Sequence, residues 1–308
     1  MYLKRKIDEY LLEWKKNEER LPLIIKGARQ VGKTESINHF AEQNYSNIVS
    51  INFVLEPKYK TILSDGYAVE DIIKNISMID TSKRFIAGDT VIIFDELQEF
   101  PDIATALKSF RIDGRFDVIC SGSLLGIHYR KIHSNSVGYK TDYEMFSMDF
   151  EEFLWAKGYS EKHIEDILKH MQTGTPFSET ELSVYKKLFL EYCVLGGMPA
   201  VVKVYIEKNL FTDTLEIQRQ IQMDYEEDIR KYGLQLEPDY RAWENPIGGS
   251  DNGSFAKVGI PIIWYHTDGH PDYHQPSDHA DRLNWDKVVE ITKASFLNMW
   301  KMANEKSF

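Results

Sequence analysis

Residues 21–34 read LPLIIKGARQVGKT, and this stretch decides how the first half of the chain is interpreted. A short apolar run of strand length leads into a glycine-containing loop, and the residues that follow, TESINHFAEQN, have helical spacing. The loop fits the pattern G-x4-G-K-T at every defined position, which is the Walker A pattern of a P-loop. It consists of Gly27, Ala28, Arg29, Gln30, Val31, Gly32, Lys33 and Thr34.

Each defined position of this loop has a chemical reason. Glycines let backbone N–H groups turn toward phosphates, and the N-terminus of the next helix adds positive potential. The Lys33 side chain can reach the β- and γ-phosphates of a nucleotide, and the Thr34 hydroxyl can bind magnesium. The sequence therefore predicts that the chain binds ATP with Mg²⁺. The alternative is a chance match on a glycine turn, and the flanking strand and helix argue against it.

A second candidate element is DTVIIFDEL, residues 89–97, a continuous apolar run that ends in two acids. Such runs are typical of strands buried on both faces of a parallel sheet. Ligands of open α/β sheets bind at the carboxyl ends of the strands, where Asp95 and Glu96 stand. We expect Asp95 to hold magnesium through water and Glu96 to act as the general base on the attacking water. An acidic pair that merely starts a solvated loop is the alternative, because EFPD follows.

Further segments of strand length alternate with helical ones up to Phe150. NIVSINFV, FDVICSGS and YEMFSMD have strand patterns, whereas DIATALKSFRIDG and the N-terminal MYLKRKIDEYLLEWKK have helical ones. The alternation predicts an α/β fold, a parallel-sheet P-loop NTPase core of three layers. The pattern after Phe150 is helical, and a glycine and a proline break it near Gly233–Pro238. We therefore predict a core at 1–155, a helical lid at 156–233 and a small α/β C-terminal fragment at 234–308.

Composition narrows the class of protein. Of the 308 residues, 43% are hydrophobic and 28% are charged, and no run of 18 apolar residues occurs, so we expect no membrane span. Cys120 and Cys193 stand far apart in apolar contexts, which favours free thiols in a reducing compartment and a cytoplasmic location. The net charge of −11 does not indicate a nucleic-acid partner, since phosphate backbones require a basic surface.

Several segments also resemble the bacterial and archaeal AAA-type P-loop ATPases that carry a C-terminal domain of uncharacterised role. GARQVGKT, VIIFDELQEFPD, CSGSLLG, FSMDFEEFLWAKG and EYCVLGGMPAVV carry the resemblance, which runs from about residue 1 to 233. It implies an ATPase core with a helical lid, and a polar residue that senses the γ-phosphate at the end of the strand after the acidic one. That position maps to the Ser121–Ser123 segment, with Ser123 preferred, although a helix N-cap is an equal interpretation of this serine.

The chain departs from that group in two respects. Many relatives have a Gly-Arg pair before the FSMDFEEF-like segment, whereas Gly138 is followed here by Tyr139, so no finger arginine is assigned. The relatives also continue into their own C-terminal domain beyond IQMDYEEDIRKYG, and this chain has a different sequence there.

Residues 236–308 resemble an unrelated family, the C-terminal end of co-catalytic zinc exopeptidases such as aminopeptidases and glutaminyl cyclase-like enzymes. GGSDNGSFAKVGIPIIWYH and HPDYHQPSDHAD carry this match. His274 occupies the position of that family's last zinc ligand, but Asn252 stands where many relatives have histidine. The other ligands of a two-zinc site lie upstream in the family, where this chain has ATPase-like sequence, so we do not expect zinc. The chain thus has the pattern of a chimera.

Three functions follow from these patterns. The leading hypothesis is a Mg²⁺-dependent AAA-type ATPase with a non-catalytic, peptidase-like tail. The second is a zinc-dependent exopeptidase, and the third is an ATP-binding interaction module with little turnover. Besides ATP, an unidentified protein partner is expected, and self-association is expected if the strand of the tail exposes an unpaired edge.

Overall fold

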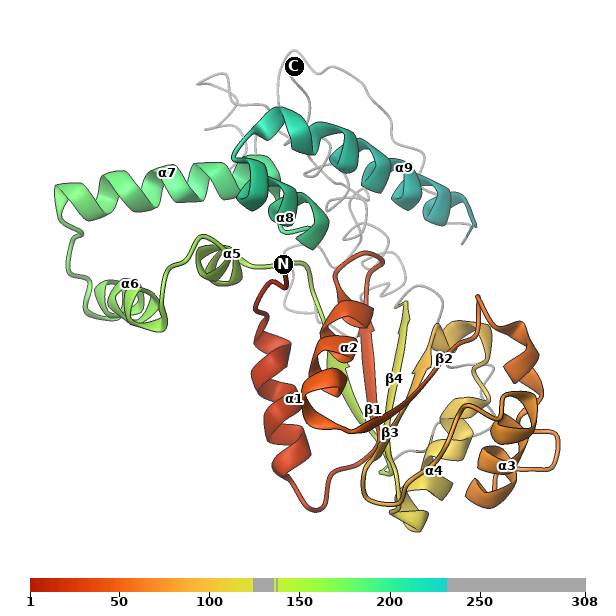
Figure 1. The fold of residues 1–308 in the computed structure, drawn as a ribbon. Coiled ribbons are helices and arrows are strands. Elements are labelled where there is room, and N and C mark those ends of the chain that lie inside the picture. The colour runs from red at the N-terminus through yellow and green to blue at the C-terminus, as the bar shows by residue number, and fades with distance from the viewer. Residues whose placement is uncertain (124–135, 137, 232–308) are drawn as a thin grey trace, which may run out of the picture. The chain divides into compact units, whose positions relative to one another are not determined.

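A computed structural model describes residues 1–123, 136 and 138–231 (Figure 1). The chain divides into two units, Met1–Thr214 and Leu215–Phe308, and each is described by itself. In the second unit the described element is helix α9, Leu215–Lys231. The predicted C-terminal fragment and His274 lie outside the described residues. In the described part of the chain, no helix is both long and apolar enough to cross a bilayer.

The first unit begins with a sheet and its covering helices and continues with helices alone. The strands are β1 Leu23–Gly27, β2 Asn47–Asn52, β3 Thr90–Asp95, β4 Asp117–Ser123 and β5 Thr141–Glu144. The helices of this first part are α1 Lys6–Lys16, α2 Lys33–Asn44, α3 Val69–Ile79 and α4 Ile103–Asp113, with short 3-10 turns η1 Pro57–Thr61 and η2 Leu97–Glu99. The later helices are α5 Phe150–Ala156, α6 Glu161–Thr173, α7 Glu179–Leu195 and α8 Pro199–Lys208, followed by η4 Phe211–Thr214.

The five strands form one parallel sheet in the order β2-β3-β4-β1-β5. Every residue of β3 is buried, as its uninterrupted apolar run predicts for an inner strand. Alternate residues enter different cores: Ile92 packs with α3 and α4, whereas Ile93 packs with α1 and α2. Helices therefore cover both faces of the sheet (Figure 1). This confirms the predicted three-layer α/β fold.

The N-terminal helix is shorter than its sequence pattern predicts. Helix α1 begins at Lys6, and Arg5 before it has an extended backbone. The Asp8 carboxylate accepts a hydrogen bond of 2.8 Å from the Arg5 N–H, which satisfies a donor that would otherwise be unpaired at a helix start. Residues 1–5 therefore form a segment that precedes the helix, with an extended backbone at Arg5.

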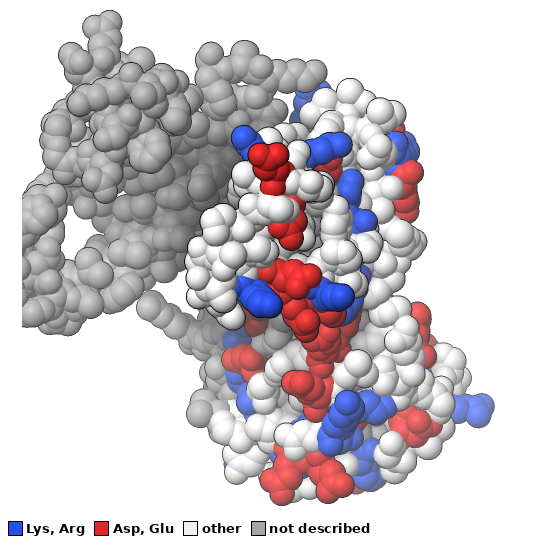
Figure 2. Space-filling model, turned by 90° about the vertical axis from the view of Figure 1, so that its left-hand side faces the viewer, with Lys and Arg blue, Asp and Glu red and all other residues white. Residues whose placement is uncertain are grey.

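Surface ion pairs join this N-terminal segment and the first residue of α1 to α5 and α6. Lys4 Nζ lies 2.6 Å from a Glu161 carboxylate oxygen, and Lys6 Nζ lies 2.6 Å from carboxylate oxygens of both Asp149 and Glu151. Figure 2 shows acidic side chains gathered at the middle of one face, with lysine or arginine side chains beside them. Because the Lys4 and Lys6 side chains are each 44% exposed, we expect each pair to contribute little to stability.

Candidate functional site

The phosphate-loop residues lie between β1 and α2, as the motif predicts. The two glycines of the motif are needed for different reasons. Gly32 has φ of 97°, in the left-handed region that favours glycine. Gly27 is crowded instead, because a Cβ atom there would lie 2.2 Å from the Met145 carbonyl oxygen. Gln30 also has a positive φ, 63°, so two separate residues of the loop have this uncommon backbone conformation.

Lys33 is the first residue of α2, and its side chain folds back over the loop. Its ammonium group donates to the carbonyl oxygens of Gly27 and Ala28 at 3.0 and 2.7 Å. Burial lowers the pKa of Lys33, while the negative charges of Glu96 and Asp95 oppose that shift and Arg29 adds to it. The Lys33 ammonium group is therefore within electrostatic reach of both predicted acids.

Asp95 lies at the end of β3, where it accepts hydrogen bonds from several polar groups, and it is only 6% exposed. Its Oδ2 atom accepts from the Thr34 hydroxyl at 3.2 Å and from Asn52 Nδ2 at 3.0 Å. Its other oxygen, Oδ1, accepts from the Glu96 N–H at 3.0 Å and from the Ser121 hydroxyl. The carboxylate is thus held on both oxygens while one of them contacts the first turn of α2.

Sheet topology explains why these side chains meet. Asn52 lies opposite Asp95 at the ends of β2 and β3, and β4 with Ser121 is the next strand. The carboxyl ends of parallel strands lie at one edge of a sheet, where α/β folds bind ligands. The sequence motifs predict Asp95 and Thr34 but not Asn52, and the family resemblance favours Ser123 over Ser121. Asn52 is the last residue of β2, so its place at the carboxyl end of a strand was a signal that pointed to it, whereas Ser121 lies two residues before the end of β4 and had no such signal.

Glu96 has a left-handed backbone, with φ of 60° and ψ of 49°, which is uncommon for a residue with a side chain. Its carboxylate accepts a hydrogen bond from Gln98 Nε2. Gln98 Oε1 in turn accepts from the Ser123 backbone N–H at 3.1 Å. Gln98 therefore connects the predicted base to the predicted sensor. The Ser123 hydroxyl is buried and has no hydrogen-bond partner among the described residues.

This set of groups fits a magnesium–nucleotide complex. Thr34 and Asp95 offer hydroxyl and carboxylate oxygens 3.2 Å apart, and hard oxygen donors are the ligands that Mg²⁺ prefers. Zinc would require a different set. Residues 1–123, 136 and 138–231 contain no group of three or more His, Cys, Asp and Glu side chains that could hold a metal ion.

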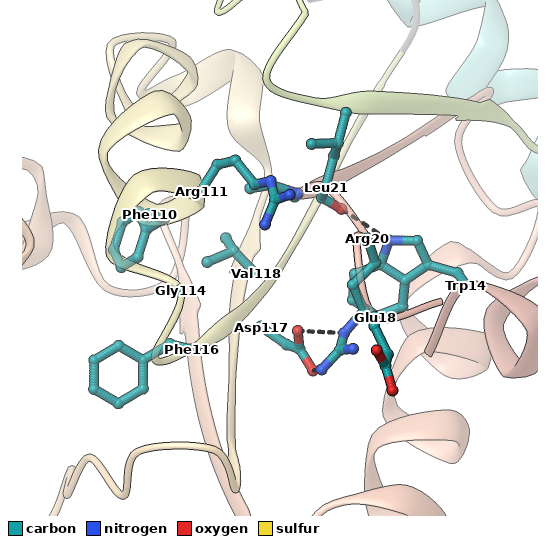
Figure 3. A pocket seen from close by; sticks show the side chains of 11 residues that line it. Trp14, Glu18, Arg20, Leu21, Phe110, Arg111, Gly114, Phe116, Asp117 and Val118 are labelled. Atoms are coloured by element: carbon teal, nitrogen blue, oxygen red, sulfur yellow. Dashed lines mark hydrogen bonds and ion pairs between the residues drawn. The ribbon is translucent and has the colours of Figure 1, made fainter. Parts of the chain in front are cut away.

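A hollow of about 70 Å³ lies at the opposite edge of the sheet, where the strands begin. Figure 3 shows Arg20 beside Asp117 and Trp14 beside Leu21 in its wall. Arg20 Nε lies 2.6 Å from Asp117, which also accepts from the Tyr45 hydroxyl at 2.7 Å. These bonds tie the beginnings of β1 and β4 together, so we assign this hollow to the packing of the sheet edge and not to the nucleotide.

Comparison with known families separates the two parts of the chain. The model of the AAA domain family matches residues 19–154. The model of Peptidase family M28 matches residues 202–298. The chain joins an AAA-like segment to a peptidase-like segment. The peptidase match begins within α8, so it reaches into the region that the sequence analysis assigned to the helical lid.

Some solved structures resemble the chain distantly. The C. elegans PCH-2 structure has a TM-score of 0.37 and 12% identity, over 65% of this chain and 59% of that one. A Thermotoga maritima RuvB structure has a TM-score of 0.39 and 15% identity, over 84% of this chain and 83% of that one. Domain III of T. maritima DnaA has the same two values, over 71% of this chain and 94% of that one. Among curated proteins no sequence matches this chain.

Proposed function

We propose that the chain binds ATP with Mg²⁺ at the loop of residues 27–34 and hydrolyses it. The observation that carries this proposal is the 3.2 Å contact between the Thr34 hydroxyl and the Asp95 carboxylate, because Thr34 directly follows Lys33 in the loop. These three groups come from a helix start and a strand end that are 61 residues apart in sequence. The fold is that of an AAA-type P-loop ATPase-like domain, and the AAA domain match covers all three residues.

Each residue of the cluster then has a defined task. The loop amides and the Lys33 ammonium bind the phosphates, with Lys33 exchanging the Gly27 and Ala28 carbonyls for phosphate oxygens. Magnesium, when bound, neutralises charge on the phosphate oxygens; Thr34 would hold it directly, and Asp95 would hold it through water. Asn52 and Ser121 fix the Asp95 carboxylate from neighbouring strands.

Glu96 is the group that we assign to the attacking water. Its left-handed backbone turns the chain sharply just after β3, and Gln98 holds its carboxylate. A carboxylate fixed in this way can orient a water molecule and accept its proton. Ser123, held through its N–H by the same Gln98, is our candidate for the residue that contacts the γ-phosphate.

Phosphate release from ATP tests the hydrolysis step. We expect Glu96→Gln to lower turnover roughly a hundredfold or more while ATP affinity is kept, because a general base contributes about that factor. Glu99→Gln is the matched control, since Glu99 follows in the same turn and pairs with Lys60 at the surface. Equal loss in both variants would remove Glu96 from this role. A parent chain that binds ATP without releasing phosphate would support the interaction module instead.

The Peptidase family M28 match favours a second candidate function, zinc-dependent exopeptidase activity. We propose that the tail is non-catalytic, because a two-zinc site requires several ligands and His274 is the one that the sequence resemblance supplies. Purified chain is expected to hold well under one zinc per molecule and to cleave no aminopeptidase substrate when zinc is added. Stoichiometric zinc in the parent that is lost in His274→Ala would favour the peptidase.

A further inference from the structure

Arg5 is a buried arginine that contacts the phosphate loop from outside the motif. The residue is 4% exposed and lies in the segment before α1. Its Nη1 donates to the Val31 carbonyl oxygen at 2.7 Å, and its Nη2 donates to the Phe146 carbonyl oxygen at 2.8 Å. Its Nε lies 3.1 Å from Glu152 Oε1, with both side chains almost fully buried. One guanidinium group thus joins the loop, the β5–α5 connection and α5.

The contact with Val31 acts on the peptide that precedes Gly32. In a planar trans peptide the carbonyl and the N–H of the next residue point in opposite directions. Holding the Val31 carbonyl on Arg5 therefore directs the Gly32 N–H away from Arg5. Gly32 is the residue with φ of 97°, so this peptide lies where the loop depends on an unusual backbone conformation. The bond to Arg5 keeps that peptide from rotating.

We propose that Arg5 is a positioning residue that sets the phosphate loop for ATP. The inference rests on the proposed function. Preorganised amides bind a phosphate without first having to reorder, so a fixed loop binds more tightly than a mobile one. The forked guanidinium reaches two carbonyls and a carboxylate at once, which the single ammonium group of a lysine cannot do.

The alternative is that Arg5 is needed only for the packing of α5. Glu152 allows the two roles to be separated, because it is the partner of Arg5 on α5 and does not contact the loop. Its carboxylate also accepts the Lys6 N–H at 2.7 Å and the Asp149 N–H at 3.2 Å. Glu152→Gln therefore weakens the attachment of α5 while the Arg5–Val31 bond is kept.

The test measures ATP affinity and thermal unfolding in the full chain. Arg5→Lys keeps a positive charge beside Glu152 and is expected to fold, but to bind ATP at least about tenfold more weakly, as expected for a lost charge-assisted hydrogen bond. Glu152→Gln is expected to lower the unfolding temperature and to leave ATP affinity unchanged. In Arg5→Ala, added methylguanidinium is expected to restore ATP affinity, whereas urea at the same millimolar concentration is not.

The outcomes distinguish the positioning role from the proposed function. If the parent and a folded Arg5→Lys bind ATP equally tightly, the role of Arg5 is wrong and the ATP site stands. If ATP affinity falls equally in Glu152→Gln and Arg5→Lys, the contact with α5 is responsible and the positioning role is again wrong. A parent chain that binds no ATP contradicts the proposed function, and the role of Arg5 with it.

Discussion

At the scale of single residues, the candidate site depends on how Asp95 is held. Four donors surround its carboxylate, and they come from α2, β2, β4 and the backbone of Glu96. Groups that orient a metal-binding carboxylate commonly affect affinity nearly as much as the ligands themselves. Asn52 is the donor on β2, and the sequence pattern alone assigned it no role beyond a strand.

Replacing Asn52 tests this arrangement. In Asn52→Ala, we expect half-maximal ATP binding to require a roughly tenfold higher Mg²⁺ concentration, because Asp95 loses a fixed hydrogen-bond donor. Asn47→Ala is the matched control. Asn47 begins the same strand, at the opposite edge of the sheet, and bonds the Arg84 carbonyl and the Thr90 hydroxyl. The measurement is an ATP titration at stepped Mg²⁺ concentrations. If the two variants show the same requirement, Asn52 has no part in the site.

The residues of the motif were predictable because the pattern itself names them. Lys33 and Thr34 begin α2, and Asp95 and Glu96 stand at the end of β3, as the motifs predict, although the roles of these residues stay predictions. Arg5 was not predictable, since its partners Val31, Phe146 and Glu152 lie 26, 141 and 147 residues further along the chain. No local pattern marks an arginine whose contacts are all made by folding.

At the scale of elements, the connection between β5 and α5 lies between the phosphate loop and the turn that ends α7. At Met145, this connection lies so close to the phosphate loop that a Cβ atom on residue Gly27 would meet the Met145 carbonyl oxygen. At the other end, the Met148 N–H donates to the Gly197 carbonyl at 2.7 Å, and the Met148 carbonyl accepts from the Tyr192 hydroxyl at 2.9 Å. The later helices are therefore attached to the core through the same connection that borders the loop.

Gly197 provides a test of that attachment. A Cβ atom there would lie 2.0 Å from the Met148 carbonyl oxygen, so Gly197→Ala forces two backbone segments apart. We expect its free energy of unfolding in urea to fall by about 1–3 kcal/mol, the usual range for overpacking. In Gly158→Ala, the control, no atom lies within 4 Å of the added carbon, although φ of 88° strains it. We expect this control to lose less than Gly197→Ala, about 1–2 kcal/mol, which is the cost of a left-handed backbone for a residue with a side chain. If Gly197→Ala and Gly158→Ala lose the same free energy of unfolding, the close approach of Gly197 to Met148 adds no cost of its own.

Sequence patterns predicted the elements better than their ends. The inner strands were predictable because burial on both faces requires an unbroken apolar run, as in β3. The start of α1 was not predictable, because residues 1–5 continue the helical spacing while Arg5 has an extended backbone. The close approach of Gly197 to Met148 also left no local signal, since the two residues belong to elements 49 positions apart.

At the scale of the whole molecule, the chain joins two segments that match different families. The described structure divides at Thr214 and Leu215, whereas the peptidase match begins at 202. The domain limits at 155 and 233 stay predictions. The AAA-like part contains a five-stranded parallel sheet with a hydrophobic core on each face, and a hydrophobic core of its own allows a domain to fold independently.

Limited proteolysis tests how the two parts are joined. We expect brief protease treatment of the full chain to cut between residues 233 and 243 and to leave a fragment of about residues 1–235 that still binds ATP, because domain linkers are the preferred sites of cleavage. Mass spectrometry of the fragments locates the cut. Initial cleavage within 1–214, or a fragment that cannot bind ATP, would contradict an independent ATPase unit.

The central claim, that residues 27–34 form an ATP site, is tested most directly by titrating ATP with Mg²⁺ into the full chain and into Lys33→Ala. We expect micromolar affinity in the parent and at least about a tenfold loss in Lys33→Ala, because the ammonium group that meets the phosphates is removed. Lys74→Ala is the control, since Lys74 lies exposed on α3. Its affinity should equal that of the parent. Equal affinity in the parent and Lys33→Ala would contradict the claim.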